Sequence, residues 1–254
     1  MSLVDEYERQ FQWRDWKTVL DSLPSLHGQI VFDLGCGIGD LAAELAVRGA
    51  EVIAADMNEA LLQSARVRAK ARPLERVEFR AVDLRTDVDW GIRADGVWCS
   101  FLAAYFVDLP PALTSWTKNL KPGGWIALTE VDDMFGHQPL SPRTTARLTA
   151  YYDDSLAAGR YDFRAGRKLK QHLGNAGFCV THSLTLEDRE LSFNGPADPG
   201  VVEAWRSRFE RMHLLRQFLE DDFDQVRSEF LDCLTREDHR STAKVYTAIG
   251  NRNP

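Results

Sequence analysis

A run of apolar residues that breaks into three alternate glycines constrains this 254-residue chain most strongly. Residues 31–40 read VFDLGCGIGD, with glycine at positions 35, 37 and 39. The apolar run predicts a strand, the glycines a tight turn, and the following residues the start of a helix. Glycine tolerates positive φ and lets another group approach the backbone closely. An ordinary strand-to-helix turn needs one such residue, so three in five residues indicate a ligand lying over the turn.

Short apolar runs alternate with helical patterns through the first half of the chain. Further strands are predicted over residues 51–56, 77–82, 96–101 and 125–131. Strands of this length separated by helices of ten to fifteen residues imply βαβ units, and therefore a mainly parallel sheet covered on both faces. An amphipathic helix is expected before the first strand, over residues 5–21, either packing on the core or closing over a ligand as a lid.

The regular alternation ends after residue 133. The patterns there predict helices over about 142–158 and 165–175, a strand over 178–185, a helical hairpin over 199–219 and 222–235, and a final strand over 244–249.

Polar residues follow the predicted strands where a parallel sheet binds its ligands, beyond the carboxyl ends. The second strand ends at Asp56, the third is followed by Asp83, and the fourth reaches Ser100. A carboxylate about twenty residues beyond a glycine turn is suited to accept hydrogen bonds from both hydroxyls of a ribose. These positions indicate a cofactor that contains a nucleoside.

The glycine spacing separates the nucleotide classes. The pattern here is GxGxG, whereas dinucleotide-binding turns read GxGxxG, so NAD is disfavoured. The GxxxxGK[ST] loop of NTPases is absent from the sequence, so ATP is disfavoured as well.

Four segments together resemble the class I S-adenosylmethionine-dependent methyltransferases. They are residues 33–39, 52–56, 81–84 (AVDL) and 120–124 (LKPGG), in the order and spacing of that family. The resemblance implies an α/β fold with a doubly wound, mainly parallel seven-stranded sheet, the Rossmann-like methyltransferase fold, carrying helical lid insertions.

The resemblance also implies site residues for S-adenosylmethionine, whose product is S-adenosylhomocysteine. Asp33 and the backbone of Gly35, Cys36, Gly37 and Gly39 would face the methionine and ribose, Asp56 the ribose hydroxyls, Met57 and Leu84 the adenine, Asp83 the adenine amino group, and Ser100 the methionine end.

The resemblance predicts that the chain is divided into three parts. Residues 1–27 would form an N-terminal helix or lid, and residues 28–133 the S-adenosylmethionine-binding core. Residues 134–254 would complete the sheet, with acceptor-binding helical insertions over about 134–176 and 195–240.

The methyl acceptor is expected to be a small molecule. Methyltransferases of nucleic-acid amino groups commonly carry [DN]PP[YFW] after the fourth strand, where this chain has Ser100 followed by FLA. The net charge of −7 gives no basic surplus for nucleic acid. Residues in segments that could wall the acceptor pocket are Trp13, Tyr105, Phe135, Tyr151 and Arg160.

His137 is the candidate general base, because it follows the fifth strand and histidine titrates near neutral pH. The activated methyl needs mainly an oxygen or nitrogen nucleophile held in line for displacement, and a base helps only if the acceptor must first lose a proton. Two alternatives stay open: a non-catalytic cofactor-binding or interaction module of the same fold, and an aminopropyl transferase that uses decarboxylated cofactor.

The cysteine pattern, the first residues and the lengths of the apolar runs argue against a metal site, a signal peptide and a membrane span. The four cysteines are scattered without CxxC pairs, so no metal site is expected and a reducing cytoplasm is the natural setting. The start of the sequence lacks the features of a signal peptide, and no apolar run approaches the roughly 20 residues that span a bilayer. We expect a cytoplasmic monomer or homodimer with no nucleic-acid or membrane partner.

Overall fold

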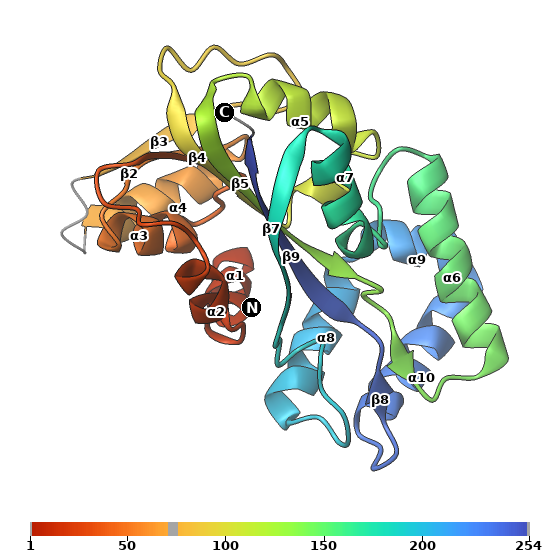
Figure 1. The fold of residues 1–254 in the computed structure, drawn as a ribbon. Coiled ribbons are helices and arrows are strands. Elements are labelled where there is room, and N and C mark those ends of the chain that lie inside the picture. Colours follow the sequence, from red (N-terminus) through yellow and green to blue (C-terminus); the bar gives the residue numbers. More distant parts are fainter. Residues whose placement is uncertain (1, 71–75, 253–254) are drawn as a thin grey trace.

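A seven-stranded sheet forms the centre of the computed structural model, which describes residues 2–70 and 76–252 (Figure 1). Its strands are β1 (Ile30–Leu34), β2 (Glu51–Asp56), β3 (Val77–Ala81), β4 (Ala94–Ser100), β5 (Leu120–Asp132), β7 (Phe178–Leu186) and β9 (Lys244–Arg252). They lie in the order β3-β2-β1-β4-β5-β9-β7, and only β9 runs antiparallel to its neighbours. The predicted doubly wound, mainly parallel sheet is confirmed.

Helices cover both faces of the sheet and add a second layer beside its later strands. They are α1 (Leu3–Gln12), α2 (Trp16–Asp21), α3 (Asp40–Val47), α4 (Glu59–Lys70), α5 (Leu109–Thr117), α6 (Pro142–Ala157), α7 (Leu169–Asn175), α8 (Pro199–Arg211), α9 (His213–Leu219) and α10 (Phe223–Leu234). Figure 1 shows α6 and α8 to α10 gathered beyond the ends of β5 and β9, with α1 and α2 at the carboxyl edge of the sheet. The helical insertions predicted for the second half are present.

The strand order reverses between β1 and β4, because the chain builds β2 and β3 on one side of β1 before it returns to the other. Fully buried apolar side chains such as Val31, Phe32 and Trp98 hold these two strands in the core. Ligands of open α/β sheets bind at such a reversal, beside the carboxyl ends of the strands.

Several element boundaries differ from those expected. The helix predicted over residues 5–21 is two helices, because Arg14 pairs with Asp188 as an isolated β-bridge and Asp15 caps α2 by accepting a hydrogen bond from the Thr18 N–H. The helix predicted over residues 199–219 is likewise divided, at Met212.

A small two-stranded sheet was not predicted: β6 (His137–Gln138) pairs with β8 (Arg240–Ser241). Two-residue strands carry too little alternation to be read from sequence.

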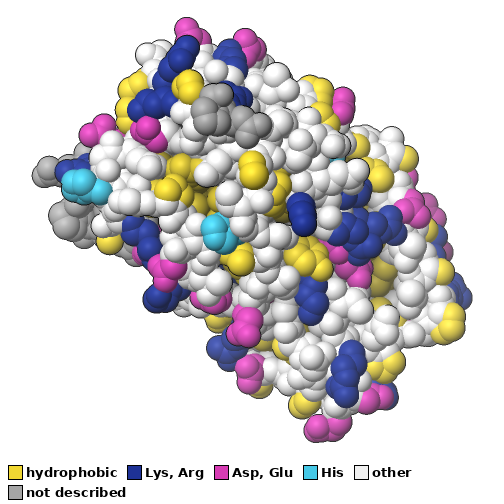
Figure 2. All heavy atoms as spheres, in the orientation of Figure 1, with side chains coloured by type: hydrophobic (Ala, Val, Ile, Leu, Met, Phe, Trp, Pro, Cys, Tyr) yellow, Lys and Arg dark blue, Asp and Glu magenta, His cyan; other side chains and the backbone are white. Residues whose placement is uncertain are grey.

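Surface charges of both signs are spread over the face in Figure 2, where blue and magenta side chains lie near one another. Within the described part of the chain, no helix has both the length and the apolar character needed to cross a membrane.

Candidate active site

A cavity of about 500 Å³ opens at the point where the strand order reverses. Nine of the ten predicted cofactor residues line it: Asp33, Gly35, Cys36, Gly37, Asp56, Met57, Asp83, Leu84 and Ser100. They come from the ends of β1, β2 and β4 and from the segment after β3. The tertiary fold thus brings together residues that are up to 67 positions apart, Asp33 and Ser100.

The glycine turn has the backbone that its sequence predicts. Gly35, Gly37 and Gly39 have φ angles of +74°, +53° and +81°, in the left-handed region that favours glycine. The N–H groups of Gly35 and Cys36 both donate to the Ala55 carbonyl, which ties the turn to β2.

Gly39 is the one predicted cofactor residue that does not line the cavity. A Cβ at this position would lie 2.9 Å from the Phe79 ring and 3.2 Å from Ala65, so the glycine allows the start of α3 to pack against β3 and α4. Its observed role in the structure is packing.

Asp56 stands at the end of β2 with its carboxylate fixed by two backbone donors. Oδ2 accepts from the Gly37 N–H at 2.9 Å, and Oδ1 accepts from the Asn58 N–H at 2.8 Å. Asn58 in turn accepts from the N–H groups of Ala60 and Leu61, which caps the start of α4. Each carboxylate oxygen has a second acceptor site, so Asp56 can also accept hydroxyl hydrogens from the cavity.

Asp33 is a buried carboxylate with an oxygen that has no hydrogen-bond partner among the described residues. Asp33 is the last residue but one of β1 and is 2% exposed. Its Oδ2 accepts no hydrogen bond from any described residue. Burial, reinforced by the Asp56 charge, raises the pKa of Asp33 to about 7. Since a buried unpaired acceptor is costly, a cationic or N–H donor in the cavity would stabilise this side chain.

Asp83 and Met57 lie at the more open side of the cavity. The Asp83 carboxylate receives hydrogen bonds from the Arg85 guanidinium at 2.8 and 2.9 Å, which hold its pKa at about 2. Met57 is 62% exposed, an apolar side chain left uncovered beside a polar one. A ligand lying here would meet an anionic acceptor and an apolar surface.

The N-terminal segment contributes five cavity residues that were not among the predicted site residues: Tyr7, Gln10, Phe11, Arg14 and Trp16. The helical pattern over residues 5–21 identified an apolar face, but the break at Arg14 turns this residue toward the cavity. Only its pairing with residue 188, which is 174 positions away, could have revealed this.

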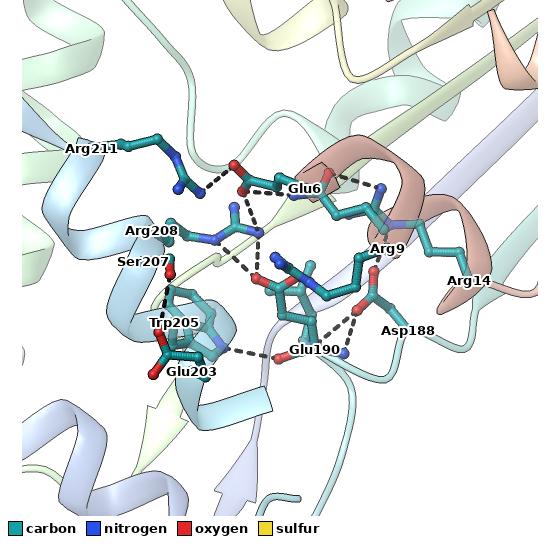
Figure 3. Close-up of polar contacts among 12 residues, drawn as sticks. Glu6, Arg9, Arg14, Asp188, Glu190, Glu203, Trp205, Ser207, Arg208 and Arg211 are labelled. Carbon is teal, nitrogen blue, oxygen red and sulfur yellow. Dashed lines mark hydrogen bonds and ion pairs between the residues drawn. The ribbon is translucent and has the colours of Figure 1, made fainter. Parts of the chain in front are cut away.

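Arg14 belongs to a buried charge network that joins α1 to α8 and to the segment after β7 (Figure 3). Its Nε donates to Asp188 at 2.6 Å, and the two side chains are 6% and 1% exposed. The guanidinium also stacks over the Phe101 ring, 4.1 Å from its centroid. Asp188 accepts from the N–H groups of Glu190 and Leu191 as well, so both partners are fixed.

Glu190 and Arg208 form the second buried pair of this network. Arg208 donates to Glu190 Oε1 at 2.5 and 3.0 Å, and Glu6 on α1 lies 3.7 Å from Arg208 and is hydrogen-bonded to Arg211. Burial alone would raise the pKa of Glu190, but the charge of Arg208 outweighs it and holds that pKa below its usual range. The network fixes α1 over the cavity.

Two of the five predicted acceptor-pocket residues, Tyr105 and Arg160, line the cavity. Phe135 and Tyr151 do not; each is 4% exposed and packed in the aromatic core, to which α6 contributes Tyr151. Trp13 lies between the guanidinium groups of Arg9 and Arg189, outside the cavity lining. The structure therefore places these three residues in packing contacts and not in the cavity lining.

His137 is also outside the cavity lining, so the predicted base has no geometric support. It is 1% exposed, and its ring packs against Phe193, Trp205 and Phe230. Burial, with His239 nearby, lowers the pKa of His137 to about 3, so the ring is neutral. The β6 pairing carries residue 137 beyond the end of β5 and into the helical layer.

The acidic residues of β5 are engaged elsewhere. Glu130 is fully buried and accepts from the Ala104 N–H, the Val131 N–H and the Tyr161 hydroxyl, while Asp132 is paired with Arg167. Neither lines the cavity. Among residues 2–70 and 76–252, no group of three or more His, Cys, Asp or Glu side chains is arranged to hold a metal ion.

Comparisons with known proteins agree with this geometry. A family model described as a methyltransferase domain matches residues 31–124. The ubiquinone biosynthesis O-methyltransferase of Leptothrix cholodnii is 32% identical over 171 residues, which are 66% of this chain and 71% of that protein.

Solved structures share the fold at low identity. A structure described as a putative methyltransferase from Bacillus halodurans has a TM-score of 0.63 at 18% identity and covers 94% of this chain and 99% of its own. Phosphoethanolamine N-methyltransferase 2 of Haemonchus contortus, solved with phosphomonomethylethanolamine and S-adenosylhomocysteine, has a TM-score of 0.57 at 19% identity, covering 94% of this chain and 53% of its own.

Proposed function

Because the chain belongs to the class I S-adenosylmethionine-dependent methyltransferases, we propose that it methylates an oxygen atom of a small molecule in the cavity between α1 and the β1–β4 edge. The observation that carries the proposal is the convergence of nine predicted cofactor residues on that single cavity. The Leptothrix cholodnii relative, named as an O-methyltransferase, supports oxygen as the acceptor atom ahead of nitrogen.

The cavity residues suit the chemistry of S-adenosylmethionine. Its amino-acid part carries an ammonium and a carboxylate, and the cavity offers the unpartnered carboxylate of Asp33 for the first and the fixed guanidinium of Arg14 for the second. Asp56 would hold the ribose hydroxyls. Asp83 and Met57 would meet the adenine, with Leu84 beside them.

The Arg14 guanidinium also favours the intact cofactor over its decarboxylated form. The decarboxylated cofactor of an aminopropyl transferase has no carboxylate to pair with a cation at this position, and Arg14 would then be a charge at the cavity without a counterpart from the ligand.

The protein's part in the reaction is positioning. When bound, S-adenosylmethionine supplies a methyl group already activated by its sulfonium. The cavity wall then needs to hold the acceptor oxygen in line with that methyl, which can contribute roughly 7–11 kcal/mol to the barrier reduction. No histidine lines the cavity in the part of the chain that the structure describes, and burial raises the pKa of Tyr7 to about 12. An acceptor oxygen that is already ionised at neutral pH would therefore react without a protein base.

We also propose that the three parts of the chain have the separate roles expected from the sequence. Residues 28–133 would bind the cofactor, residues 1–27 would cover it, and the helices of residues 134–254 would shape the acceptor side. The contribution of α1 to the cavity and the two cavity residues Gly159 and Arg160 after α6 support this division.

Calorimetric titration with S-adenosylmethionine, S-adenosylhomocysteine and decarboxylated S-adenosylmethionine tests the cofactor. We expect the first two to bind and the third to bind at least about tenfold more weakly, since it lacks one charge-assisted pair. Transfer of labelled methyl from S-adenosylmethionine is then measured over a panel of phenols, carboxylic acids and amines. Absence of binding by either intact compound at millimolar concentration would contradict the proposal, and labelling confined to amines would move the acceptor atom to nitrogen.

A further inference from the structure

Arg160 occupies a fixed position at the acceptor side of the cavity. It follows α6 in a turn where the Arg160 N–H donates to the Ser155 carbonyl, the Gly159 N–H donates to the Leu156 carbonyl, and Gly159 has φ of +67°. This pair of bonds is a Schellman end, which gives the chain one direction after the helix. Two residues later the Asp162 N–H donates to the Ala104 carbonyl, so the backbone is held on both sides of Arg160.

The Arg160 guanidinium has hydrogen-bonding capacity that the protein does not use. Its only described partner is Asp154, which accepts from Nη2. Nε is buried and has no acceptor among the described residues. The side chain is 34% exposed and lines the cavity. A buried donor without an acceptor is costly, and a guanidinium with free N–H groups matches the geometry of a carboxylate or phenolate.

The carboxylates that line the cavity come from elements other than the one that carries Arg160. These carboxylates, Asp33, Asp40, Asp56 and Asp83, all lie at or after β1, β2 and β3. The lining contributed after β4 and α6 is aromatic, apolar or cationic, and includes Phe101, Tyr105 and Phe106. The acidic residues Glu130 and Asp132 of β5 are engaged with Tyr161 and Arg167, so among the described residues Asp154 is the carboxylate that pairs with Arg160.

We propose that Arg160 is an anion subsite for the methyl acceptor, and that the acceptor class is a small planar acid carrying a carboxylate or an ionised phenol. This inference rests on the proposed function, since it concerns the same cavity. Arg160 acts on specificity: it would pair with the acid group, while Tyr105 and Phe106 would contact the apolar part of the molecule.

The test uses the full-length protein saturated with S-adenosylhomocysteine and three probes of one shape: benzoate, benzamide and benzylamine. Ligand-observed NMR titrations should show benzoate binding at least about tenfold more tightly than the neutral and cationic probes, because only benzoate forms a charge-assisted pair. Arg160→Gln should weaken benzoate by about tenfold and Arg160→Lys by less, because lysine keeps the charge but loses the two-pronged geometry.

Two further variants sharpen the result. Asp154→Asn removes the competitor for the guanidinium and should strengthen benzoate binding. Arg164→Gln is the matched control, because Arg164 lies in the same segment, pairs with Asp153 and is outside the cavity lining; it should leave benzoate binding within about twofold of wild type.

Cofactor binding separates the two proposals. Arg160→Gln should bind S-adenosylhomocysteine as wild type does. Failure of the wild type to bind it contradicts the proposed function. The anion subsite is overturned by any of three results obtained while S-adenosylhomocysteine binds normally. Benzoate does not bind, benzamide binds as tightly as benzoate, or Arg160→Gln leaves the benzoate affinity unchanged.

Discussion

Replacing Asp33 by asparagine should have opposite effects on stability and on cofactor binding. The Asp33 carboxylate is buried at the end of β1, and burial together with the Asp56 charge raises its pKa from 3.8 to about 7. A raised pKa in the folded state means that ionisation of Asp33 opposes folding. This penalty is absent below pH 3.8, grows as the pH rises toward 7, and is constant above that.

The size of the penalty follows from the shift. One pKa unit corresponds to about 1.4 kcal/mol, so keeping Asp33 ionised at pH 8 lowers the free energy of unfolding by about 4 kcal/mol. Asparagine removes the charge but buries an amide, which costs roughly 1–3 kcal/mol where it lacks partners. Without cofactor, Asp33→Asn should therefore be more stable than wild type by about 1–3 kcal/mol at pH 8. At pH 4 this gain should vanish or reverse.

Cofactor affinity should change in the other direction. If Asp33 pairs with the ammonium of S-adenosylmethionine, losing that pair costs about 1.5–3 kcal/mol, or roughly 10- to 150-fold in Kd. Wild-type affinity should rise between pH 5.5 and 7.5 as Asp33 ionises, whereas Asp33→Asn should lose that rise.

Calorimetric titration with S-adenosylmethionine and urea unfolding of the unliganded protein, each at several pH values, measure the two effects. Asp95→Asn is the control: Asp95 lies at the other end of β4, where it accepts from the Ile30 N–H and Lys121, and its replacement should leave cofactor affinity unchanged. The reasoning fails if Asp33→Asn binds S-adenosylmethionine within threefold of wild type, or if it is less stable than wild type at pH 8.

Three further substitutions test the site and its support. Asp56→Ala should weaken S-adenosylmethionine binding by well over tenfold, because a charged hydrogen-bond pair is worth about 1.5–3 kcal/mol; titration showing a change below threefold would exclude Asp56 from the ribose site. Asp188→Ala should lower the free energy of unfolding in urea by about 3–5 kcal/mol, since it leaves the buried Arg14 charge unpaired, while Asp198→Ala, at a 59% exposed side chain, should cost less than about 0.5 kcal/mol; equal losses would argue against a structural role for the buried pair. His137→Gln should retain the specific activity of the folded enzyme within about twofold while lowering its stability, because the ring packs in the core and is not at the cavity; loss of methyl transfer with unchanged unfolding would restore His137 as a catalytic candidate.

Local sequence determined the cofactor half of the cavity. The GxGxG turn requires positive φ that only glycine adopts easily, Asn58 caps a helix through its own side chain, and Asp56 is placed by the strand that precedes it. These are interactions over a few residues. Parallel strands that share one orientation then bring their carboxyl ends to the same edge, so the positions of Asp56, Asp83 and Ser100 at one cavity could be anticipated from the strand pattern.

Tertiary structure decided the rest. Arg14 lines the cavity because Asp188, which is 174 positions away, interrupts the first helix, and His137 leaves it because β6 pairs with β8. Phe135 and Tyr151 were assigned to the pocket from their position in the chain, but the aromatic core buried both. Aromatic and histidine side chains can serve a core or a site equally well, and only the long-range packing around each one selects between these uses. The glycine turn predicted where the cofactor would bind, whereas the proposed acceptor side depends on contacts that no local pattern encodes.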